Sequence, residues 1–114
     1  MTKYDAVKDK AFVGSSGEET YRWWASAAVF LPVTPGDSIS VDTARIVSNN
    51  VLVAYDSNKE YLSYWNLGNQ ISRTVTMPAN AKYVRVNFRT VWLDDCYILN
   101  GTTGEYLLKG KNVP

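Results

Sequence analysis

The stretch KYVRVNFR, residues 82–89, alternates polar and apolar side chains more regularly than any other part of the chain. Successive side chains of a β-strand point to opposite faces. One face then consists of Val84, Val86 and Phe88. The other consists of Tyr83, Arg85, Asn87 and Arg89. The apolar face is suited to a core, and the polar face, with two long hydrogen-bond donors, is predicted to be open to solvent.

The segments on either side of this strand have the same period of two. Ile39 and Val41 share a face, as do Val51, Val53 and Tyr55. We predict a hairpin in which residues 56–59 connect the strand at Val51 to a strand over 61–65, and a second hairpin at Asn100-Gly101. About eight strands, spaced by roughly 8 to 12 residues without a clear helix, predict an all-β antiparallel sandwich of jelly-roll type. The length of 114 residues indicates a single domain over 1–114.

Composition excludes several classes of function. A net charge of +1, with Lys and Arg spread along the chain, argues against nucleic-acid binding. No apolar run approaches the roughly 20 residues that span a bilayer, so we expect a soluble protein without membrane insertion. The chain has no histidine and one cysteine, Cys96, which removes the commonest general base and any cysteine-based metal cluster. Cys96 is expected to pack as a small apolar residue.

Three segments give the sequence a resemblance to a known kind of domain. They are LPVTPG at 31–36, YDSNK at 55–59 and MPANAKYVRV at 77–86. The chain resembles small jelly-roll domains, similar to carbohydrate-binding modules, of bacteriophage tail fibres, baseplates and surface-adhesion proteins. The resemblance covers residues 11–108 and implies a galactose-binding-like sandwich on a virion tail or another extracellular surface. The same segments also have local roles, since Pro35-Gly36 is suited to a turn and Pro78 to the start of a strand.

Two adjacent tryptophans precede the apolar run ASAAVFLPV. If the strand continues regularly, Trp23 lies on the same side as Val29, Leu31 and Val33 and belongs to the core. Trp24 then points the other way, where it would stack on a sugar ring or contact a neighbouring subunit. Packing of Trp24 on a nearby loop is the alternative.

Other residues are candidates for the same ligand. Tyr64 and Trp65 end a predicted strand, and Trp92 precedes two acids. Each ring could instead be packed in a half-buried position. Arg85, Asn87 and Arg89 would donate hydrogen bonds to sugar hydroxyls or to a carboxylate of an acidic glycan, or form a solvated face with cross-strand ion pairs.

The adjacent acids Asp94 and Asp95 invite a catalytic or metal-binding interpretation. Glycoside hydrolysis needs two carboxyl groups that face one bond, whereas adjacent strand residues diverge. We therefore expect no enzymatic activity and no cofactor. Six to eight oxygen ligands are usual for calcium and no EF-hand spacing is present, although a structural calcium ion at this pair stays open.

The sequence thus favours a non-catalytic module that binds cell-surface glycans by stacking on aromatic rings, with specificity from Arg and Asn. Its partners would be a polysaccharide and other subunits of a larger assembly, and several copies would act together. The alternatives are a structural spacer or oligomerisation module of a fibre and an accessory module of a glycoside hydrolase.

Overall fold

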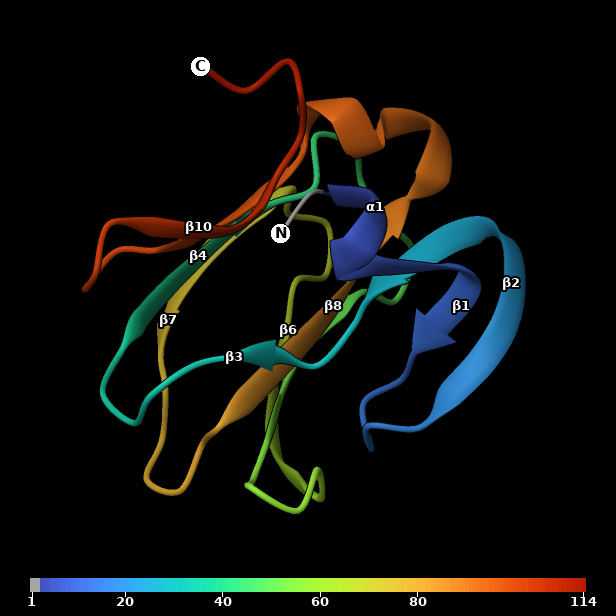
Figure 1. Ribbon diagram of the computed structural model, residues 1–114. Helices are drawn as coiled ribbons and strands as arrows, with labels where there is room; N and C mark the ends of the chain where they lie inside the picture. The colour runs from blue at the N-terminus through green and yellow to red at the C-terminus, as the bar shows by residue number, and fades with distance from the viewer. Residues whose placement is uncertain (1–2) are drawn as a thin grey trace.

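The computed structural model describes residues 3–114 and shows two antiparallel β-sheets packed face to face (Figure 1). A short helix begins the described chain, and a 3-10 helix lies between β8 and β9. The elements are α1 (Lys3–Ala6), β1 (Val7–Val13), β2 (Glu19–Ala28), β3 (Leu31–Pro32), β4 (Ser38–Asp42), β5 (Val51–Tyr55), β6 (Tyr61–Asn66), β7 (Ser72–Thr76), β8 (Tyr83–Arg89), η1 (Thr90–Asp95), β9 (Tyr97–Asn100) and β10 (Glu105–Lys109).

The strand order confirms the predicted jelly-roll sandwich. One sheet has the order β1-β2-β8-β5-β6, with β3 also paired to β8, and the other has the order β10-β9-β4-β7. The chain crosses between the sheets after β3, β4, β6, β7 and β8, so strands that are neighbours in sequence often lie in opposite layers. The described residues form ten strands rather than about eight, partly because LPV contributes only the two-residue β3.

The main core lies between the sheets and contains the apolar face predicted for β8. Val84, Val86 and Phe88 are fully buried there. From the other sheet come Ile39, Val41, Ile98 and Leu108, which are also buried. Burial of about ten large aliphatic and aromatic side chains, at roughly 1.5–3 kcal/mol each, is the main force that holds the layers together.

The second face of β8 was predicted to be open to solvent, and this prediction is wrong for the middle of the strand, although Arg89 at its end is exposed. Arg85 is only 5% exposed and Asn87 is fully buried. The β1–β2 hairpin, at the right of Figure 1, covers them, since β1 pairs with β2 and also contacts β8. A bulge between Asp9 and Ala11, with Lys10 at φ 59°, marks the point where β1 bends.

The hairpin also creates a second, smaller core on the outer side of the first sheet. It consists of Ala11, Val13, Ala27, Val51, Val53 and Tyr55. β5 is therefore buried on both faces, which explains why all five of its residues are buried. The shared face predicted for Val51, Val53 and Tyr55 is confirmed, although it lies in this outer core.

The two adjacent tryptophans have the reverse of the expected burial. Trp23 is 72% exposed, whereas the half-buried Trp24 packs against the cluster of Phe12, Ala25 and Val47. The centroids of the Phe12 and Trp24 rings are 5.9 Å apart in an edge-to-face arrangement. The prediction failed because β2 ends at Ala28, so the alternation does not continue from Leu31 back to the tryptophans.

Both predicted hairpins are confirmed. In the first, Asp56 accepts hydrogen bonds from the backbone of Asn58 and Glu60 between the paired strands β5 and β6. In the second, Asn100 Oδ1 accepts from the N–H groups of Thr102 and Thr103 between β9 and β10. These side chains replace backbone acceptors within the turns.

The two prolines singled out in the sequence have different outcomes. Gly36 adopts φ 87° in a turn after Pro35, as predicted. Pro78 does not start a strand, because it lies in the loop that precedes β8. Within residues 3–114, no helix is long and apolar enough to cross a membrane.

Candidate functional site

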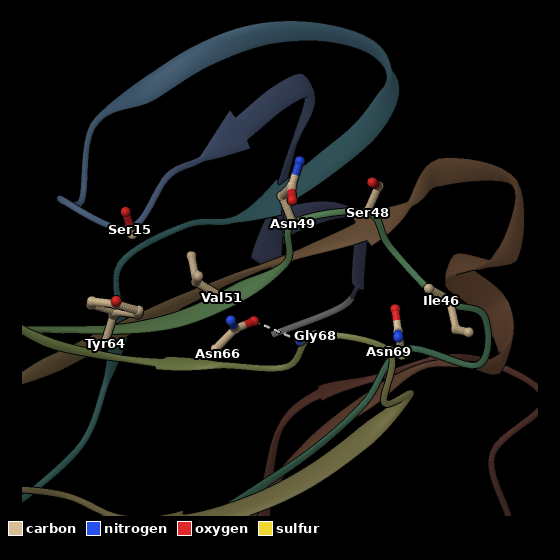
Figure 2. Close-up of a pocket in the computed structure, with 9 residues that line it drawn as sticks. All are labelled: Ser15, Ile46, Ser48, Asn49, Val51, Tyr64, Asn66, Gly68 and Asn69. Carbon is tan, nitrogen blue, oxygen red and sulfur yellow. Dashed lines mark hydrogen bonds between the residues drawn. The ribbon is translucent and has the colours of Figure 1, made fainter.

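A cavity of about 390 Å³, lined mainly by amide and hydroxyl side chains, opens beside the β5–β6 pair (Figure 2). We call it the polar cavity. Its lining residues are Ser15, Ile46, Ser48, Asn49, Val51, Tyr64, Asn66, Gly68 and Asn69. They come from the loop after β1, the loop before β5, strands β5 and β6, and the turn after β6. Such groups can exchange hydrogen bonds with the hydroxyls of a ligand.

Tyr64 supplies the exposed aromatic ring of the polar cavity. It lies on β6 opposite Val53 and is 47% exposed. Asn66 ends the same strand, where its Oδ1 accepts a hydrogen bond from the N–H of Gly68 at 2.7 Å. This bond directs the amide nitrogen of Asn66 away from Gly68, as Figure 2 shows. A ring and an amide donor therefore stand on one strand beside the opening.

A buried network fixes the two loops on the opposite side of the polar cavity. Asn87 Oδ1 accepts from Val13 N–H at 2.6 Å, and Asn87 Nδ2 donates to Val13 C=O at 2.9 Å. Asn87 Nδ2 also donates to Asn50 Oδ1 at 3.0 Å, and Asn50 Nδ2 donates to the Asn87 carbonyl. Val13 precedes the loop of Ser15, and Asn50 follows Asn49. Asn87 thus acts as a positioning residue for the two loops, through its bonds to Val13 and Asn50.

A second cavity, of about 560 Å³, shares Ile46 with the polar cavity. We call it the arginine cavity. Its lining residues are Ala44, Arg45, Ile46, Ile71, Arg89 and Trp92. The guanidinium carbon of Arg45 lies 4.0 Å from the centroid of the Trp92 ring, and that of Arg89 lies 5.7 Å from the centroid of Trp24. Two cationic groups and an indole therefore adjoin the amides of the polar cavity.

The structure brings together some of the predicted site residues and separates others. Tyr64, Arg89 and Trp92 line the two cavities, and Trp24 contacts Arg89 from outside the lining. Trp65 is partly buried against the main core. Arg85 and Asn87 lie in the interior, where the fold itself uses their donors. The residues that sequence reasoning missed are Arg45, Asn49, Asn66 and Asn69.

Arg85 connects the covered face of β8 to the β1–β2 hairpin. Its Nε donates to the Ala28 carbonyl at 2.6 Å, and its terminal nitrogen lies 2.8 Å from Glu19 Oε1. Lys8 pairs with the other oxygen of Glu19. The hydrogen bonds from Lys8 and then from Arg85 lower the pKa of Glu19 below its ordinary value of 4.5. Arg85 thus has a structural role here and does not reach either cavity.

Asp94 and Asp95 belong to η1, which is a 3-10 helix rather than the expected strand. Asp94 lies 3.8 Å from Lys111, and Asp95 accepts a hydrogen bond from Asn112. Across the described part of the chain, no group of three or more His, Cys, Asp or Glu side chains could hold a metal ion. The pair thus contacts the C-terminal segment and lies outside the linings of both cavities.

Cys96 follows η1 and is fully buried, as expected. Its thiol donates to the Trp92 carbonyl at 3.2 Å. Burial raises the pKa of Cys96 to about 12 from an ordinary 9.0, so the thiolate is suppressed at neutral pH. Cys96 therefore contributes packing below Trp92.

Comparison of the chain with protein-family models, with curated proteins and with solved structures found no match.

Proposed function

We propose that the protein is a non-catalytic glycan-binding module whose binding site is the polar cavity. The observation that carries this proposal is the exposed ring of Tyr64 beside the side chains of Asn49, Asn66 and Asn69. A sugar ring has an apolar C–H face, which packs on an aromatic ring, and a rim of hydroxyls, which exchange hydrogen bonds with amides. The cavity provides both kinds of contact within one volume.

The shape of the site suits weak binding strengthened by multiplicity. The lining is mainly polar, and a single site of this kind is expected to bind with a Kd on the order of millimolar to micromolar, about −4 to −8 kcal/mol. Several linked copies would raise the apparent affinity by about 10² to 10⁴. This supports a place in a multivalent apparatus for attachment to cell surfaces, such as a phage tail fibre or baseplate, as the sequence resemblance implies.

A glycan array tests the proposal. The chain is displayed as a multimer on streptavidin and compared with the variants Tyr64→Ala and Tyr106→Ala. Tyr106 is the matched control, because it is 37% exposed but lies on β10 of the other sheet. We expect glycan signals that Tyr64→Ala abolishes and Tyr106→Ala retains. An array without signals for the wild-type multimer would contradict glycan binding.

A second candidate function is a contact between subunits, and the exposed residues of β2 favour it. Tyr21 and Trp23 occupy one side of the strand and are 66% and 72% exposed. Aromatic rings of this kind are enriched at protein interfaces. This function predicts that the chain forms an oligomer in light scattering and that Trp23→Ser converts it to a monomer. A monomeric wild-type chain over the micromolar range would argue against it.

A further inference from the structure

The arginine cavity presents two guanidinium groups that the described structure leaves without a carboxylate partner. Arg45 and Arg89 both line it and are both exposed. The ion pairs between described residues instead join Lys8 and Arg85 to Glu19, and Lys111 to Asp94. Two like charges beside one volume repel each other, and an anion placed between them would relieve that repulsion.

Arg45 is held in an orientation that suits a carboxylate. Its guanidinium carbon lies 4.0 Å from the Trp92 ring centroid, a distance at which the planar group covers the indole face. A guanidinium that stacks by its face keeps its N–H donors in the plane, where they can form two parallel bonds to one carboxylate. Lysine lacks this fork, so the arrangement is specific to arginine.

The backbone of Arg45 is fixed as well as its side chain. The hydroxyl of buried Thr43 donates to the carbonyls of Arg45 and Ile71. Ala44 has φ 61°, in the left-handed region that alanine rarely adopts, and its N–H donates to Asp42 Oδ1 at 2.8 Å. The bonds of Thr43 connect the loop that contains Arg45 to the segment that contains Ile71. The bond from Ala44 occupies one oxygen of the Asp42 carboxylate.

Arg89 reaches the same cavity from a different element. It ends β8, where its backbone pairs with Ala25 of β2, and its guanidinium lies over Trp24 at 5.7 Å. Thr90, the next residue, is joined to Ser26 through their hydroxyls at 2.7 Å. The backbone of Arg89 is therefore held by β2, and its guanidinium group enters the lining of the arginine cavity from the end of β8.

We propose that the arginine cavity binds the carboxylate of an acidic sugar, a uronic or sialic acid, while the neighbouring sugar of the same glycan occupies the polar cavity. The inference rests on the proposed glycan-binding function and narrows its ligand to acidic glycans. Ile46 lines both cavities, so one oligosaccharide can extend from the amides of one to the arginines of the other. The volume of about 560 Å³ lies within the usual range for small-ligand sites.

Calorimetric titration with matched pairs of oligosaccharides tests this inference. The pairs are 3′-sialyllactose with lactose, and a hyaluronan tetrasaccharide with the neutral tetrasaccharide of N-acetylglucosamine. We expect at least one acidic member to bind about tenfold or more tightly than its neutral partner. The preference for the acidic member should weaken only moderately when NaCl is raised from about 50 to about 300 mM, because salt screens a charge pair in direct contact less than it screens distant charges.

Three variants separate a specific site from general charge. Arg45→Gln and Arg89→Gln should each lower the affinity for the acidic member about tenfold and leave the neutral member unchanged. Arg45→Lys keeps the charge but loses the fork, so it should recover only part of the affinity. Lys109→Gln, on β10, removes the same charge away from the cavity and should change neither. Circular dichroism and melting confirm that each variant is folded.

The outcomes distinguish this inference from the function on which it rests. Equal binding of acidic and neutral members would overturn the preference for acids and leave glycan binding intact. An acidic preference that Lys109→Gln weakens as much as Arg45→Gln would also overturn it, because the attraction would then be general. Failure of both acidic probes, together with an array on which only neutral glycans bind, would overturn the inference alone. An array without any signal would overturn both proposals.

Discussion

Replacement of Asn87 by leucine should destabilise the fold strongly, because its side chain bonds to three buried groups. These groups are Val13 N–H, Val13 C=O and Asn50 Oδ1. Leucine has a similar size but removes all three bonds, so that both Val13 groups lose their partner and Asn50 Oδ1 keeps only the longer bond from the backbone N–H of residue 87, at 3.3 Å. At about 1–1.5 kcal/mol for each lost bond, the free energy of unfolding should fall by about 3–5 kcal/mol. A domain of this size has only about 5–15 kcal/mol in total.

Urea denaturation measures this loss as a change in midpoint at constant slope. The melting temperature should fall by roughly 12–20 °C, at about 4 °C for each kcal/mol. Asn112→Leu is the matched control, since Asn112 is exposed and makes one side-chain hydrogen bond, to Asp95. Its expected loss is below about 1 kcal/mol. Equal losses for the two variants would refute the role given to Asn87.

Two substitutions and one labelling experiment test other contacts of the fold. Gly110→Ala should lower the free energy of unfolding by about 2 kcal/mol or more in a urea titration, because its Cβ would lie 2.3 Å from the Asp94 carbonyl oxygen. Glu19→Gln should cost about 1–2 kcal/mol, since it leaves buried Arg85 without its carboxylate. The pKa of Glu19 is lowered in the folded protein, so this stabilisation is present above the ordinary value of 4.5 and is lost as pH falls through the folded pKa. The free energies of unfolding of the wild type and the variant should therefore converge in acid. A difference between them that stays constant with pH would contradict the ion pair with Arg85. Cys96 should react with Ellman's reagent only after unfolding, and rapid reaction of the native protein at pH 8 would contradict its burial.

The strands and hairpins could be predicted because their signals are local. A period of two in residues 82–89 is a property of adjacent residues, and the side chains of Asp56 and Asn100 bond backbone only two to four residues away. Such patterns depend only on residues that are close in the sequence, and the tertiary structure leaves these local contacts unchanged.

The covered face of β8 could not be predicted from the same pattern. Its alternation of polar and apolar residues has the form of a half-exposed strand, but Asn87 is satisfied by Val13, 74 positions away, and by Asn50, 37 positions away. A buried polar residue with long-range partners has the same local sequence as an exposed one. The prediction for Trp23 failed for a related reason. Since β2 ends at Ala28, the alternation of faces cannot be carried from Leu31 back to Trp23.

Part of the candidate site could be found from composition and part could not. Three lining residues were predicted: Tyr64 as a ring at a strand end, Trp92 as a ring before two acids, and Arg89 as a donor on the polar face of residues 82–89. Arg45 and Asn49 lie in the irregular loop between β4 and β5, where no period applies. The polar run Ser48-Asn49-Asn50 was an available signal, since asparagine tolerates the left-handed backbone that Asn49 adopts at φ 59°.

The position of a bound glycan tests glycan binding at the polar cavity most directly. A ¹H–¹⁵N spectrum of the labelled chain is titrated with the glycan that gives the strongest array signal. Binding at the polar cavity predicts that the largest shift changes fall on the amides of Ser48, Asn49, Tyr64 and Asn66. Changes confined to Tyr21 and Trp23 on β2, with the cavity amides unmoved, would contradict it.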